Sequence, residues 1–94
     1  MSKPHERFRA WQLGHDLVLA VYRATSGWPM EERFGLVTQA RRAAVSAQLN
    51  LVEGAAGRGP GDFARFLDNA NGSLADLEYA LRLARDLGHI GAQD

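Results

Sequence analysis

The side chains that could bind a metal ion are few and widely spaced. Di-iron sites in helical bundles need glutamates from two helices and a Glu-x-x-His motif from each of two others. The nearest match is Asp86-x-x-His89, which stands alone near the predicted end of a helix. His5 and His15 have no partner at ligand spacing. We therefore expect no metal site, and no motif predicts another cofactor.

Nucleophilic catalysis is the second chemistry that the residue types allow. Ser46, Ser73, three histidines and several aspartates are present, but no nucleophile-elbow spacing surrounds either serine. Both serines also fall within helical periodicity, which favours a structural role. No pair of titratable groups stands at catalytic spacing. The sequence thus predicts no enzyme, no catalytic residue and no small-molecule substrate.

A glycine-rich segment at 54–61 could in principle cradle a phosphate before a helix. However, a predicted helix rather than a strand precedes it, and no Gly-Lys-Ser/Thr follows. Asp62 would also place a negative charge where the anion would sit. The segment is predicted to be a turn, with Arg58 at its tip as a candidate phosphate contact.

A line of polar side chains follows one side of the second predicted helix. If this line meets the third helix, Arg42 or Asn50 can bond Glu78 or Ser73, and such a buried network fixes register and partner choice. A solvated face is the alternative. Burial predicts that replacing Glu53 or Glu78 with alanine lowers the melting temperature by several degrees. The candidate network or interface residues are Gln39, Arg42, Ser46, Asn50, Glu53, Ser73 and Glu78.

The composition predicts an all-α fold without disulfides. Alanine and leucine supply 27 residues, whereas Val, Ile and Thr together supply eight, and helices favour the first pair. The absence of cysteine excludes a disulfide scaffold and a thiol nucleophile. The longest apolar run, 17–22, is far shorter than the ~20 residues that span a bilayer. No signal-peptide pattern starts the chain, so we expect a cytoplasmic protein without a membrane partner.

Glycine and proline divide the single predicted domain, residues 1–94, into helices at about 6–25, 31–53 and 62–87. The third follows an unbroken 4-3 apolar spacing from Phe63 to Ala84, with Asp62 as the expected N-cap. The second is apolar on two faces, one of them carrying Val45, Leu49 and Val52, which predicts burial on two sides. Short connections predict three antiparallel helices in an up-and-down bundle.

The residues also resemble a known family over about 8–90. The shared pattern is Trp28-Pro29-x-x-Glu32-x-Phe34-Gly35-Leu36-x-x-Gln39-x-x-Arg42-Ala43-x-x-Ser46, then Asn50-x-x-Glu53-Gly54, Phe63-x-x-Phe66-Leu67, Ala70-x-Gly72-Ser73 and Leu77-Glu78. It is similar to the bacterial four-helix-bundle proteins also called ribosomal-RNA intervening-sequence proteins. The resemblance implies a four-helix-bundle fold, a homopentamer and no enzyme activity. The family pattern continues into a fourth helix, which is missing or truncated in this chain.

The leading functional hypothesis is a homo-oligomeric scaffold or adaptor, because a chain this short is marginally stable alone. The alternative is a nucleic-acid-binding accessory protein, since a related branch of the family serves diversity-generating retroelements and binds a reverse transcriptase and nucleic acid. Residues 1–60 carry eight basic and five acidic side chains, a net +3, although the whole chain is neutral. The candidate nucleic-acid contacts are Arg41, Arg42 and Arg58, of which Arg41 is expected to be the more exposed of the adjacent pair.

Overall fold

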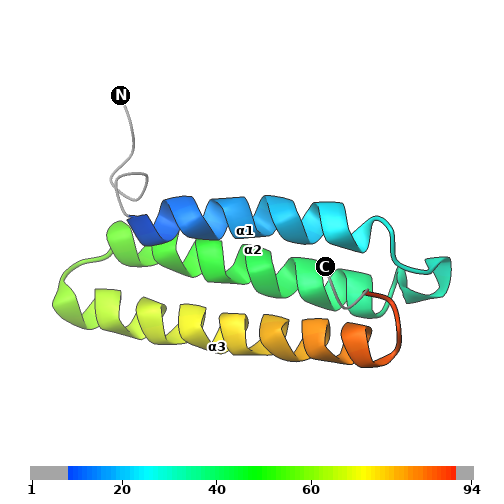
Figure 1. Cartoon of the computed structure of the whole chain (residues 1–94). Helices are drawn as coiled ribbons and strands as arrows, with labels where there is room; N and C mark the ends of the chain where they lie inside the picture. The colour runs from blue at the N-terminus through cyan, green and yellow to red at the C-terminus, as the bar shows by residue number, and fades with distance from the viewer. Residues whose placement is uncertain (1–8, 91–94) are drawn as a thin grey trace.

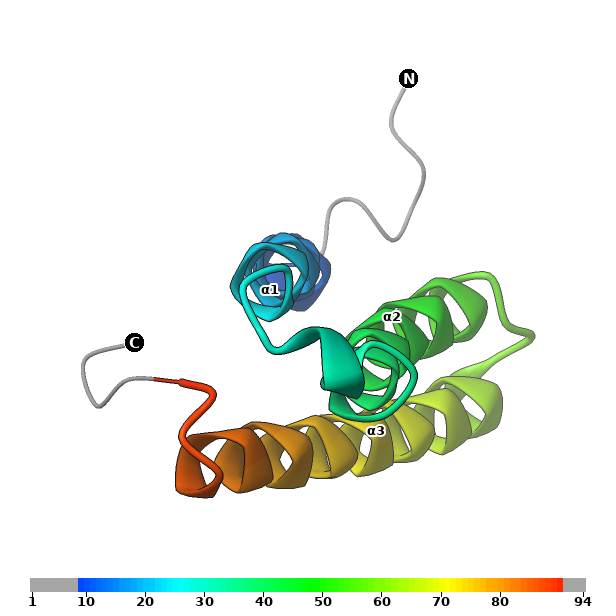
Figure 2. The same cartoon turned by 90° about the vertical axis from the view of Figure 1, so that its right-hand side faces the viewer.

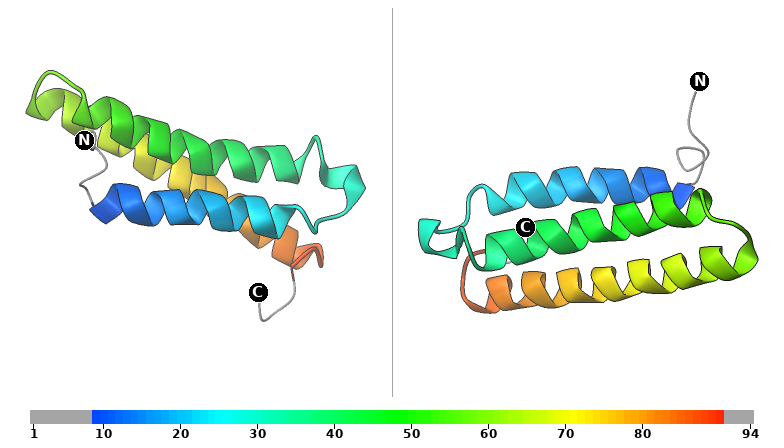
Figure 3. Two further views of the ribbon diagram at one scale, coloured as in Figure 1. Left: turned by 90° about the horizontal axis from the view of Figure 1, so that it is seen from above. Right: turned by 180° about the vertical axis from the view of Figure 1, so that it is seen from behind.

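The computed structural model describes residues 9–90, which form three α-helices and no strand (Figure 1). Helix α1 spans Arg9–Thr25, α2 spans Leu36–Ala55 and α3 spans Pro60–Asp86. A single 3-10 turn, η2, covers Met30–Glu32 between α1 and α2. Helix α2 runs antiparallel to both α1 and α3 (Figures 1 and 3). The prediction of an all-α bundle of three antiparallel helices is confirmed.

Two helix starts differ from the prediction. Helix α2 begins at Leu36 rather than at residue 31, because the chain first makes the 3-10 turn η2 and then bends at Gly35. Helix α3 begins at Pro60, so Asp62 lies in its first turn and is not the N-cap. Proline suits this first helical position, since its fixed φ is helical and its missing N–H would have no partner there. The predicted start of the first helix, residues 6–8, lies outside the described residues.

Helix α2 is the central element of the bundle. It packs against both α1 and α3, whereas α1 and α3 do not approach each other closely (Figure 2). The face of α2 between them carries small side chains, of which Ala40, Ala44 and Ala47 are buried. Small residues let neighbouring helices approach closely. The prediction of two buried faces holds only in part, because Leu49 remains 57% exposed.

An apolar groove lies over α2 where α1 and α3 diverge. Its volume is about 250 Å³, and leucines from all three helices line it. Leu13 of α1 therefore stays substantially exposed, as do Leu67 and Leu74 of α3 despite their positions in the regular apolar spacing of that helix. We call this the α1–α3 groove.

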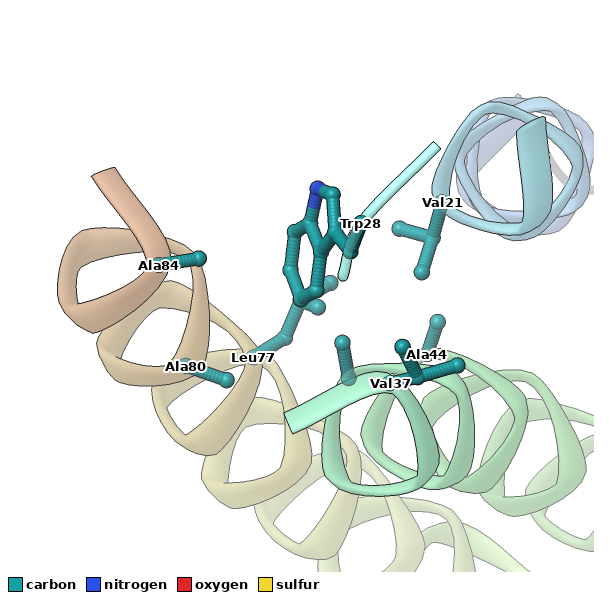
Figure 4. Close-up of a cluster of buried hydrophobic side chains, with 8 residues drawn as sticks. Val21, Trp28, Val37, Ala44, Leu77, Ala80 and Ala84 are labelled. Atoms are coloured by element: carbon teal, nitrogen blue, oxygen red, sulfur yellow. The ribbon is translucent and has the colours of Figure 1, made fainter. Parts of the chain in front are cut away.

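The core closes at the end of the bundle where α1 leads into η2. Trp28 lies there between the last turns of α3 and Val21 of α1 (Figure 4). Ala80 and Ala84 on α3 are buried, and their small side chains leave room for the indole ring (Figure 4). Trp28 thus joins two helices that do not otherwise pack against each other. The buried cluster is completed by Val37, Ala40, Ala44 and Leu77.

Candidate functional site

The outward face of α2 carries a narrow stripe of exposed or half-exposed side chains. Its members follow a 4-3-4 spacing, which places them within about 60° of one another on a helix with 100° per residue. A groove of about 710 Å³ runs between part of the stripe and α3, and one of about 540 Å³ runs between part of the stripe and α1. We call these four residues the outer stripe: Arg42, Ser46, Leu49 and Glu53.

Ser46 links the outer stripe to α3. Its hydroxyl lies 2.9 Å from the hydroxyl of Ser73, and either oxygen can donate. The side-chain amide of Asn50 donates to the carbonyl oxygen of Ser46 at 2.8 Å. The structure therefore brings Ser46, Asn50 and Ser73 into one half-buried polar cluster between α2 and α3.

The charged residues of the predicted network lie outside this cluster. Glu53 and Glu78 are exposed, and neither forms a hydrogen bond or ion pair with residues 9–90. Gln39 is also exposed, at the rim of the groove between α2 and α3. The suggested bonds from Arg42 or Asn50 to Glu78 or Ser73 do not form, because Ser46 is the partner of both Asn50 and Ser73.

This geometry changes the expected effect of mutations in the network. Ser46→Ala or Ser73→Ala should lower the free energy of unfolding by about 1 kcal/mol, since each removes the same half-buried hydrogen bond. The double variant should cost little more than either single one, because the bond can be lost only once. Glu78→Ala should change stability by less than about 0.5 kcal/mol, as an exposed and unpaired residue does. Urea denaturation of the four variants measures these differences, and additive losses at the two serines would contradict the pairing.

Arg41 is held within the fold instead of projecting into solvent. Its Nε donates to Thr25 Oγ1 at 2.8 Å, and its guanidinium lies 4.5 Å from the centre of the Tyr22 ring. Thr25 is itself buried and donates to the carbonyl of Val21. The expectation that Arg41 is more exposed than Arg42 is therefore wrong, because Arg41 points along the α1–α2 contact and Arg42 points outward.

Arg42 and Arg58 present free guanidinium groups. Both residues are exposed, and neither side chain has a hydrogen-bond or ion-pair partner within residues 9–90. Arg58 lies in the turn before α3, where its backbone N–H donates to Asp62 Oδ2 at 3.3 Å. The Asp62 carboxylate therefore helps to hold the shape of this turn. Arg42 lies on α2 and Arg58 lies in the turn after it, with the acidic Glu53 between them in sequence.

The model of one protein family, 23S rRNA-intervening sequence protein, matches residues 6–94 of the chain. The chain belongs to this family. A search of curated proteins gives no match. The match covers all three helices, so the bundle described above is the form that this member of the intervening-sequence protein family takes.

One close pair of titratable groups in this family member was not found by sequence reasoning. His89 Nε2 lies 2.7 Å from Glu32 Oε2, and both side chains are largely buried. The His89 ring also lies 6.3 Å from that of Trp28. Residues 57 positions apart meet here because the turn after α3 folds back over η2. Neither residue lines the grooves described above, and their contacts close the end of the core.

Within residues 9–90 of this intervening-sequence family member, no group of three or more His, Cys, Asp or Glu side chains converges as a metal ion requires. None of the described helices combines the length and apolar character of a membrane span.

Proposed function

We propose that this protein is a cytoplasmic, non-enzymatic, homo-oligomeric helical scaffold or adaptor. The observation that carries the proposal is the α1–α3 groove, where three helices leave a shared apolar surface open. Leu13 is 52% exposed there, opposite the half-exposed Leu67 and Leu74. Contiguous exposed apolar surface marks sites of association in folded proteins. Covering it stabilises the assembly by about 25 cal/mol for each Å² buried.

Light scattering of the purified chain at micromolar concentration tests this proposal. We expect an oligomer, and the family resemblance suggests a pentamer. Because association stabilises the folded chain by mass action, the melting temperature should also rise with protein concentration. A monomeric mass together with a melting temperature independent of concentration would reject the scaffold proposal.

A second candidate function, nucleic-acid binding, is favoured by the free guanidinium groups of Arg42 and Arg58. Oligomerisation would repeat these cations on one assembly, and phosphate contacts by Lys and Arg supply most non-specific affinity for nucleic acids. Arginine is suited to the task because its planar fork matches phosphate oxygens.

Fluorescence anisotropy with single- and double-stranded RNA and DNA at several salt concentrations measures this activity. Arg42→Ala or Arg58→Ala should each reduce the slope of log affinity against log salt by about one per contributing site. Arg41→Ala is the matched control, since its guanidinium is occupied by Thr25 and Tyr22 and its loss should change stability instead of the slope. Absence of binding at low salt would reject nucleic-acid binding and leave the scaffold as the one proposed function.

A further inference from the structure

The groove of about 540 Å³ between α1 and α2 is lined by cations and apolar side chains. Arg41 and Arg42 line it, and no carboxylate within residues 9–90 does. Arg42 is exposed and has no ion-pair partner in that range, whereas Arg41 is held in place by its contacts with α1. Val45 and Leu49 supply the apolar lining, and Leu49 is 57% exposed. We call this the α1–α2 groove.

One side of α3 carries the complementary features. Asp76, Tyr79 and Leu83 follow a 3-4 spacing, which places them within about 60° of one another on the helix. Tyr79 is 66% exposed, and Asp76 is exposed without an ion-pair partner among the described residues. We call these three residues the α3 stripe. An exposed carboxylate beside an exposed aromatic ring matches a groove that sets a free guanidinium beside apolar side chains.

The two surfaces do not meet within one chain. Helices α1 and α3 pack against different sides of α2 and do not approach each other closely (Figure 2). Arg42 and Asp76 line opposite sides of the groove between α2 and α3, but they form no ion pair there. The α3 stripe can therefore fill the α1–α2 groove of another copy only.

We infer that the α3 stripe of one copy docks in the α1–α2 groove of the next copy. Asp76 then lies against the guanidinium of Arg42, and Tyr79 packs on Leu49. The contact joins two different surfaces, so each copy uses one surface toward one neighbour and the second surface toward the other. Contacts of this kind close into rings of odd or even number, in agreement with the pentamer that the family resemblance implies. The inference rests on the proposed self-association and names the two surfaces that carry it.

Charge complementarity selects a second copy as the occupant of the α1–α2 groove. The groove lies in residues 1–60, which carry a net +3, whereas residues 61–94 carry three basic and six acidic side chains, a net −3. Opposite charges on two surfaces favour their association and set its register. Tyrosine and arginine are also the residue types that contribute most to protein interfaces. Because Arg42 is a candidate phosphate contact as well, nucleic acid would compete with the α3 stripe for it.

Charge reversal on the whole chain tests the inference. Arg42→Glu and Asp76→Arg each replace the attractive pair at every junction with a repulsive one, and each should weaken the association by at least about tenfold. At micromolar concentration, light scattering should then report less than half of the wild-type mass, because all junctions of a ring are the same. The double variant, Arg42→Glu with Asp76→Arg, restores opposite charges at each junction and should recover the wild-type mass.

Matched reversals outside the two surfaces provide the controls. Glu78 is exposed like Asp76, but at 100° per residue it lies on nearly the opposite side of α3. Arg58 is exposed like Arg42, but it does not line the α1–α2 groove. Glu78→Arg and Arg58→Glu should therefore keep the wild-type mass. Circular dichroism checks that every variant keeps its helical content.

The outcomes separate the inference from the scaffold proposal. If the wild type is oligomeric and either Arg42→Glu or Asp76→Arg keeps more than half of its mass, the inference fails while the scaffold proposal stands. If both single reversals lower the mass and the double variant does not recover it, the two residues are not partners and the docking is wrong. A monomeric wild type rejects both proposals.

Discussion

Replacement of Trp28 by alanine should lower the free energy of unfolding by about 3–5 kcal/mol, the usual cost of removing a buried tryptophan. Trp28 is only 7% exposed and lies among Val21, Leu77 and Ala84, which come from two helices that do not pack directly. Its loss would leave a cavity at the only place where the core bridges α1 and α3 within residues 9–90. The same change removes the neighbour of the His89–Glu32 pair.

Chemical denaturation followed by circular dichroism measures this loss. Domains of this kind have a total stability of roughly 5–15 kcal/mol, so the loss should remove at least about a fifth of it. Phe34→Ala is the control, because Phe34 is an aromatic residue of the same connecting segment but is 84% exposed. We expect that change to cost less than about 0.5 kcal/mol. Equal losses at the two positions would show that Trp28 does not bridge the core.

The second large effect is expected at Gly14, where α1 and α2 approach each other closely. The side chain of Gln48 lies directly against Gly14, and a Cβ atom added to the glycine would collide with Gln48 Oε1. Gln48 is buried, and its Nε2 donates to the carbonyl of Trp11 at 2.9 Å. Gly14→Ala must displace this amide and break its hydrogen bond. We expect a net loss of about 1–3 kcal/mol, even though alanine is the better helix former.

Removing the Gln48 side chain separates the effect of the collision on the free energy of unfolding from the effect of helix propensity. In a Gln48→Ala background, Gly14→Ala no longer meets the amide, so it should stabilise the protein by up to about 1 kcal/mol through helix propensity. The same substitution would thus have opposite signs in the two backgrounds. Gly72→Ala on α3 is a control in the wild-type protein. No atom lies within 4 Å of the Cβ added there, so this change should stabilise the protein. Urea denaturation of the wild type and the four variants measures these differences, and a destabilising Gly14→Ala in the Gln48→Ala background would contradict the collision.

The candidate site shows how far sequence reasoning reaches. Helical spacing correctly indicated that Arg42, Ser46 and Glu53 share one side of α2, but it assigned Leu49 to a separate apolar face with Val45 and Val52. It could not indicate which way that side faces, because each side of a helix can meet either a neighbour or solvent. Arg41 illustrates the difficulty, since its contact with Thr25 depends on how α1 lies across α2. The contact between Glu32 and His89 is even harder to predict from the sequence, because no local pattern links residues so distant along the chain.

The sequence by itself determined that this protein is an all-α bundle of three helices, because apolar periodicity and glycine or proline breaks act within a few residues of the chain. It also supported membership of the intervening-sequence protein family through a dispersed motif. Only the tertiary structure decided that α2 is central, that α1 and α3 diverge over an apolar groove, and that Ser46 of the outer stripe bonds Ser73 of α3. The physical reason is that helix formation depends on local hydrogen bonds and side-chain spacing. Packing, in contrast, depends on which of several similar faces fit together.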